Sequence, residues 1–192
     1  MHNFLTWAWE QLDDEQALTH AQHALDLYRT FGQPAWEARA LNQVGYYSAR
    51  LGDYGTARDH CQAALALYRQ HDRQGHQSEG EASTLDSLGY IEHHTGHHDL
   101  AIHHYREALA LVRSLGDATE AAVTLDNLGH PHVALKQYDE ARTAWQEAVD
   151  LYRKQGRDTA ARLVRQQLDR LDDTSAAPIA QPGATYPDGH RR

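Results

Sequence analysis

Apolar residues recur along this chain with the spacing of an α-helix. Downstream of Ala57, for example, they stand at i, i+4, i+7, i+8 and i+11. This spacing puts them on one face of a helix and is incompatible with the alternation of a β-strand. The pattern therefore predicts an all-α protein. Four such stripes occur: Ala17-Ala21-Ala24-Leu25-Tyr28, Ala57-Cys61-Ala64-Leu65-Tyr68, Ala101-Tyr105-Ala108-Leu109-Val112 and Ala141-Trp145-Ala148-Val149-Tyr152.

A second landmark precedes three of these stripes and shows that the chain is repetitive. The alanines that open the stripes lie 40, 44 and 40 residues apart, so the period is 40 with four extra residues in the polar stretch 70–81. Each unit is predicted to be two antiparallel helices joined by a glycine turn such as Leu51-Gly52-Asp53. The landmark reads Leu41-x-x-Val44-Gly45, Leu85-x-x-Leu88-Gly89 and Leu125-x-x-Leu128-Gly129.

The repeat divides the chain into an array over residues 1–172 and a tail. The tail, 173–192, combines Pro with Ser, Ala and Gly and is predicted to be disordered. A capping helix is expected over 157–171, with Leu163, Leu168 and Leu171 facing inward. The four predicted units are 1–34, 35–78, 79–118 and 119–156.

These landmarks resemble the signature of the tetratricopeptide repeat (TPR) family, in which Leu-Gly is followed by Ala and a bulky residue on the second helix. The resemblance covers about residues 4–171. The unit is longer than the usual repeat of about 34 residues, and in this it is similar to the arrays of kinesin light chains and to the C-terminal arrays of actinobacterial NB-ARC regulators of the AfsR type. The resemblance implies a right-handed superhelical solenoid of about four helical hairpins plus a C-terminal capping helix.

The resemblance also implies a concave groove, lined by the first helices of successive units, that binds a peptide or a helix of another protein. Asp86 and Asp126 make the expected groove acidic at its centre, so we expect a partner that carries Lys or Arg. Carried over by the phase of the repeat, the groove residues are Arg39, Asn42, Tyr46, Ser83, Asp86, Tyr90, His93, Val123, Asp126 and His130.

The first unit starts at its own landmark, and apolar residues crowd its beginning. Repeat arrays need polar terminal surfaces, which this segment does not supply. Two interpretations stay open: a fragment or misassigned start, and a docking edge for a preceding domain or a second copy of the chain. The edge consists of Phe4, Leu5, Trp7 and Trp9.

Charge and composition exclude several classes of function. The formal net charge of -9 disfavours direct binding to nucleic acid, which draws its affinity from clustered Lys and Arg. No apolar run approaches the roughly 18 residues that a membrane helix needs. The single cysteine, Cys61, lies on a core stripe and excludes an internal disulfide framework. We therefore expect a cytoplasmic protein.

No motif predicts catalysis or a cofactor. The chain has no Gly-x-x-x-x-Gly-Lys and no His-Glu-x-x-His, so we expect no enzyme. Dense imidazoles take up zinc or nickel, but Gly96 interrupts the i, i+4 spacing that would pair them, and we expect no metal. The predicted function is a protein-interaction module, the sensory part of a bacterial transcriptional regulator; the alternatives are a His-rich metal-binding protein and a self-associating structural module. The crowded histidines are His93, His94, His97, His98, His103 and His104.

Overall fold

The structure, a computed structural model, describes residues 2–71 and 78–176, with side chains over 13–70 and 79–172. Within these ranges the chain forms helices alone, as the apolar spacing predicts. They are α1 (His2–Thr30), α2 (Pro34–Arg50), α3 (Tyr54–His71), α4 (Ser78–His94), α5 (His98–Ser114), α6 (Ala118–Ala134), α7 (Tyr138–Lys154) and α8 (Asp158–Ala176).

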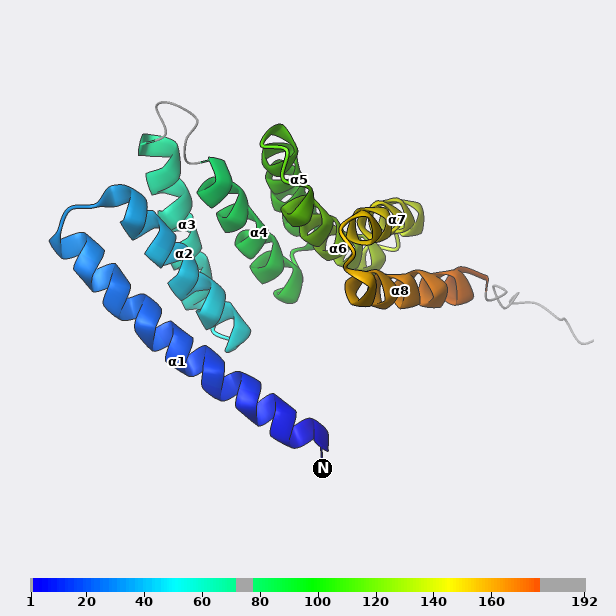
Figure 1. The fold of residues 1–192 in the computed structure, drawn as a ribbon, viewed down its shortest axis with the longest axis horizontal. Helices are drawn as coiled ribbons and strands as arrows, with labels where there is room; N and C mark the ends of the chain where they lie inside the picture. The colour runs from blue at the N-terminus through cyan, green and yellow to red at the C-terminus, as the bar shows by residue number, and fades with distance from the viewer. Residues whose placement is uncertain (1, 72–77, 177–192) are drawn as a thin grey trace, which may run out of the picture.

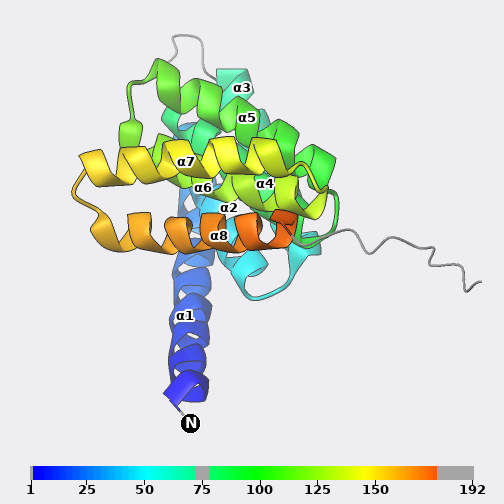
Figure 2. The same ribbon diagram turned by 90° about the vertical axis from the view of Figure 1, so that its right-hand side faces the viewer.

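The helices stack in chain order, with α1 and α8 at opposite ends of the array (Figure 1). Three hairpins, α2–α3, α4–α5 and α6–α7, form its body, and α1 packs on α2 while α8 packs on α7. Figure 2 shows α7 and α8 side by side at the C-terminal end. The first helices α2, α4 and α6 also contact one another in succession. This arrangement is an all-α solenoid.

The first unit differs from the predicted hairpin, because α1 runs as one helix from His2 to Thr30. The hairpin turns at Gly52 and Gly96 have positive φ, a conformation that residues with a Cβ adopt at a cost. Forty residues before Gly52 the chain has Leu12 in place of a glycine. The glycine turn that separates the two helices of a hairpin is therefore missing there, and the helix continues. The described array therefore holds three hairpins between two single helices rather than four hairpins and a cap.

Each Leu-Gly landmark marks a place where the two helices of a hairpin touch. A Cβ added at Gly89 would lie 2.7 Å from the ring of Tyr105, so only glycine leaves room for that side chain. The same geometry joins Gly45 to Cys61 and Gly129 to Trp145. In all three hairpins the bulky residue follows its glycine by 16 positions. This contact fixes the register of α2–α3, α4–α5 and α6–α7.

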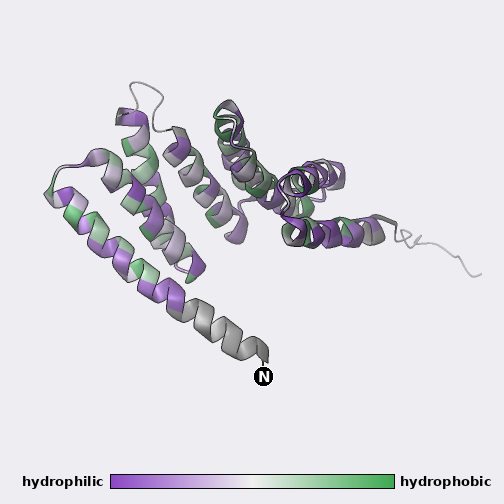
Figure 3. Ribbon diagram, viewed as in Figure 1, coloured by the Kyte–Doolittle hydropathy of each residue, from purple (hydrophilic) through white to green (hydrophobic). Residues whose placement is uncertain are grey.

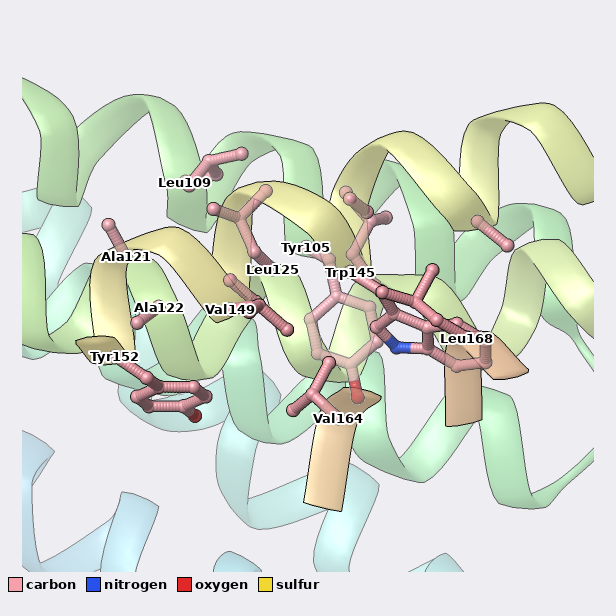
Figure 4. Close-up of a cluster of buried hydrophobic side chains, with 14 of the residues drawn as sticks. Tyr105, Leu109, Ala121, Ala122, Leu125, Trp145, Val149, Tyr152, Val164 and Leu168 are labelled. Atoms are coloured by element: carbon pink, nitrogen blue, oxygen red, sulfur yellow. The ribbon is translucent and has the colours of Figure 1, made fainter. Parts of the chain in front are cut away.

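The apolar stripes form three clusters of buried residues along the array. The largest cluster joins α5 to α8, where Trp145 and Val149 pack with Val164 and Leu168 (Figure 4). Cys61 is fully buried beside Leu85 and Leu88, which confirms its predicted core position.

The capping helix differs from its prediction at Leu163, which is 56% exposed rather than inward. Leu168 and Leu171 are buried as predicted, and Val164 takes the inward place next to them. Subtracting one period shows why: Val164 matches the buried Thr124, and Leu163 matches Val123. The helix continues to Ala176, past the predicted array end at 172, and residues 177–192 lie outside the described part of the chain.

Polar and apolar stretches alternate along the helices in Figure 3, as expected for amphipathic helices that pack on one face. No helix among the described residues is long and apolar enough to cross a membrane.

Candidate functional site

The first helices of the three hairpins line a groove that contains a cavity of about 650 Å³. Its walls come from α2, α4 and α6, with one contribution from α1. The lining residues are Asp14, Asn42, Gln43, Tyr46, Tyr47, Arg50, Ser83, Asp86, Ser87, Tyr90, Glu120, Val123 and Asn127.

The structure brings most of the predicted groove residues together on this surface. A second cavity of about 400 Å³ adjoins the first, shares Asn42, Gln43 and Ser83 with it, and is also lined by Arg39. Asn42 donates to the Ser83 hydroxyl at 3.3 Å, which ties α2 to α4 across the floor. The predicted residues that line the main cavity are Asn42, Tyr46, Ser83, Asp86, Tyr90 and Val123.

Asp86 lies in the groove but also holds two units together. Its carboxylate accepts a hydrogen bond at 3.1 Å from the side-chain amide of Asn127 on α6. Burial raises the pKa of Asp86 to about 6, and the nearby charge of Glu120 acts in the same direction, while hydrogen bonds from Thr124 and Asn127 oppose the rise. The carboxylate is therefore mostly ionised at pH 7 and already has an internal partner.

Asp126 departs from the expectation that it lines the centre of the groove beside Asp86, because it is not part of the main cavity. It is partly buried, and Gln167 of α8 donates a hydrogen bond to it. Burial raises the pKa of Asp126 to about 6. Residues 126 and 167 are 41 positions apart, as are Asp86 and Asn127, so both aspartates make the same contact between successive first helices. The accessible acid of the groove is instead Glu120, which is exposed in the cavity wall.

His93 and His130 do not line the main cavity but belong to a cluster of rings. The centroid of the His93 ring lies 5.1 Å from that of His98 and 6.1 Å from that of His130. Burial, together with the neighbouring imidazoles, lowers the pKa of His93 to about 4, so its ring is neutral at pH 7. Over the described residues, no group of three or more His, Cys, Asp or Glu side chains is arranged to hold a metal ion.

The groove wall contains an ion pair that the sequence analysis did not predict. Asp14 of α1 forms an ion pair with Arg50 of α2 at 2.8 Å, and the Arg50 guanidinium lies 5.8 Å from the Tyr46 ring centroid. Arg50 stands one helical turn after Tyr46, so extending the groove face by one turn would have found it. Asp14 reaches the groove because α1 is one straight helix, which the hairpin expected for residues 1–34 concealed.

The predicted docking edge, Phe4, Leu5, Trp7 and Trp9, lies outside the residues whose side chains the structure describes. Elsewhere on α1, Leu27 is 57% exposed. The equivalent residues Leu67, Leu111 and Leu151 are partly buried against the core.

Comparison with known proteins agrees with this repeat geometry. A tetratricopeptide repeat family model matches residues 36–114 and 80–154, which together span more than half of the chain. The chain therefore belongs to the tetratricopeptide repeat family. Among solved structures, it is similar to BtubC (BKLC) from P. vanneervenii, with a TM-score of 0.71 at 16% identity, over 85% of this chain and 67% of the other. No curated protein matches the chain.

Proposed function

We propose that the groove across α2, α4 and α6 binds a segment of another protein that carries Lys or Arg. Tetratricopeptide repeats are interaction modules, and the groove on the first-helix surface contains a cavity of about 650 Å³. The observation that carries the proposal is the placement of Asp86 and Glu120 in one cavity wall.

Charge decides the class of ligand. Of the two arginines of the groove, Arg50 is already paired with Asp14, and Arg39 lines the adjoining cavity together with Glu79, which has the opposite charge. Within the described part of the chain, no Lys, Arg or His forms an ion pair with Asp86 or Glu120. The two carboxylates therefore leave the groove with uncompensated negative charge, which a basic segment complements and an acidic one does not.

Aromatic rings supply the contact area. Tyr46 packs edge-on against Tyr47 with 5.3 Å between ring centroids, and Tyr90 packs on His94 at 4.0 Å. Rings held by such neighbours lose little conformational entropy when a peptide covers them, and they offer flat apolar faces with a polar tip.

Charge reversal at Glu120 tests the proposal. Glu120→Lys changes the charge of an exposed groove residue, and Asp59→Lys makes the same change at an exposed position on α3. Partners recovered from the host with the unaltered protein should bind Glu120→Lys more weakly and with a smaller loss of affinity at high salt. The Asp59→Lys protein should bind as the unaltered protein does. Equal weakening by both substitutions would show that only the overall charge matters.

The resemblance to the C-terminal arrays of AfsR-type proteins supports a more specific proposal, that this module is the sensory part of a bacterial transcriptional regulator in the cytoplasm. Its partner would then be, or belong to, a chain with an ATPase or DNA-binding module. Mass spectrometry of the captured partners checks this, and capture of metabolic enzymes alone would contradict it.

A further inference from the structure

A third cavity, of about 600 Å³, opens where α6, α7 and α8 meet. Its walls include Val133 of α6, Tyr138 and Trp145 of α7, and Leu163 of α8. It differs from the main cavity in chemistry, because no carboxylate lines it and these apolar and aromatic side chains, with Leu171, make up more than half of its lining. The remaining lining residues are His130, Gln166, Gln167 and Arg170.

The repeat explains why this space is hollow. One period earlier, Val133 and Tyr138 correspond to His93 and His98. There the imidazoles pack against each other and against His130, so the corresponding space between α4, α5 and α6 is occupied by rings. Between α6, α7 and α8 a valine replaces the first of these imidazoles, while Tyr138 and Arg170 stand at the places of His98 and His130 and line the open space.

Leu163 connects this cavity to the groove. Successive subtraction of the repeat spacing matches Leu163 to Val123, then to Ser83 and Arg39. Val123 and Ser83 line the main cavity, and Arg39 lines the one beside it. Leu163 thus continues the groove row on α8, and it is 56% exposed there. An exposed leucine at the rim of an apolar hollow is typical of a contact site.

We propose that this apolar cavity receives one bulky apolar side chain, Leu, Ile or Phe, of the same basic segment that lies across Asp86 and Glu120. The inference rests on the proposed function and specifies its ligand. Charge complementarity places the basic part of the segment at Asp86 and Glu120. The row of equivalent first-helix residues that ends at Leu163 then gives the segment a continuous surface toward α8. First helices are roughly 10 Å apart, so α4 and the α6–α8 cavity are separated by roughly 15 Å, or about four to five residues of extended chain.

Synthetic peptides test the proposal without knowledge of the natural partner. Each fluorescein-labelled probe carries two lysines three residues apart and, after four to six Ser or Gly residues, either Leu or Ser. A second series places that residue on the other side of the lysine pair. The unaltered protein should bind one Leu series about tenfold more tightly than its Ser counterpart, because Leu removes apolar surface from water.

Two variants locate the effect. Leu163→Glu should abolish the preference for Leu, while Leu115→Glu, which alters a 46% exposed leucine that lines none of the three cavities, should keep it. The double variant Val133→His with Tyr138→His introduces the two imidazoles that stand one period earlier, at His93 and His98. It should also lose the preference for Leu. Thermal unfolding checks that each variant folds.

Each remaining outcome decides a separate question. If Glu120→Lys weakens all the peptides but Leu163→Glu leaves the Leu preference intact, the apolar cavity is not a binding site and the groove proposal stands. If the unaltered protein binds no peptide, or Glu120→Lys changes nothing, both proposals fail. If Leu163→Glu changes the sedimentation coefficient without peptide, the cavity is a contact between copies of the chain and the inference is wrong.

Discussion

The indole N–H of Trp145 donates a hydrogen bond to the backbone carbonyl of Asp126 at 2.9 Å, across the place where Gly129 presents no side chain. One residue pair thus ties α7 to α6 by a polar contact and by close packing. Because α6 carries the last part of the groove, this contact also positions Val123 and His130.

Gly129→Ala should destabilise the array, since its Cβ would collide with the Trp145 ring. Overpacking of this kind costs about 1–3 kcal/mol. The matched control is Gly55→Ala on α3, where the nearest neighbour is a side-chain oxygen of Asp53 at 3.7 Å. There the better helix propensity of alanine should leave stability unchanged or raise it by up to about 1 kcal/mol. Chemical denaturation of both variants measures the difference.

Lys136→Gly should stabilise the turn between α6 and α7. Lys136 has a φ of 60°, the only positive value at a non-glycine residue among those described. A left-handed conformation costs about 1–2 kcal/mol for a residue with a Cβ, and glycine removes most of that cost. The reciprocal change, Gly96→Lys in the equivalent turn, should destabilise by a similar amount. Equal melting temperatures for all three proteins would contradict this account.

Cys61 should resist alkylation in the folded protein and react once the chain is unfolded. The thiol is fully buried, and burial raises its pKa to about 12, so almost no thiolate is present at neutral pH. A thiol-reactive dye added with and without denaturant measures both rates. Rapid labelling of the native protein would mean that the second unit is packed differently.

Asp86→Asn should change how stability depends on pH. Because the folded pKa of Asp86 is raised to about 6 from 3.8, the folded state holds the proton between these values while the unfolded state has lost it. This residue alone therefore lowers stability as the pH rises from about 4 to 6, and the penalty remains above pH 6.

Asparagine keeps an acceptor for Asn127 and has no charge to bury. The difference in unfolding free energy between Asp86→Asn and the unaltered protein should then grow from pH 4 to 6 in favour of the variant. Half-buried His93, whose pKa is lowered to about 4, acts in the opposite sense over this range in both proteins, so the comparison cancels its effect. A difference that is constant with pH would contradict the assignment.

The repeat phase made the core and much of the groove predictable. Cys61, Tyr105 and Trp145 recur 16 residues after a glycine, so one rule places all three. The same phase placed Tyr46, Asp86 and Tyr90 on the groove wall, where the structure has them.

The remaining features depend on facts that the period alone does not contain. The apolar character of Leu163 predicts an inward side chain, although the 40-residue shift to Val123 points to the groove. The hydrogen bonds that engage Asp86 and Asp126 depend on which polar residue, Asn127 or Gln167, the next first helix presents. The contribution of Asp14 depends on α1 continuing where a hairpin was expected.

Site-specific photo-crosslinking tests most directly whether the partner lies in the groove. Benzoylphenylalanine replaces Tyr46 in the cavity wall in one protein, and exposed Gln62 on α3 in another. With the recovered partner, illumination should give a crosslinked complex from position 46 and none from position 62. A crosslink from position 62 with none from position 46 would contradict the account and place the working surface on the second helices.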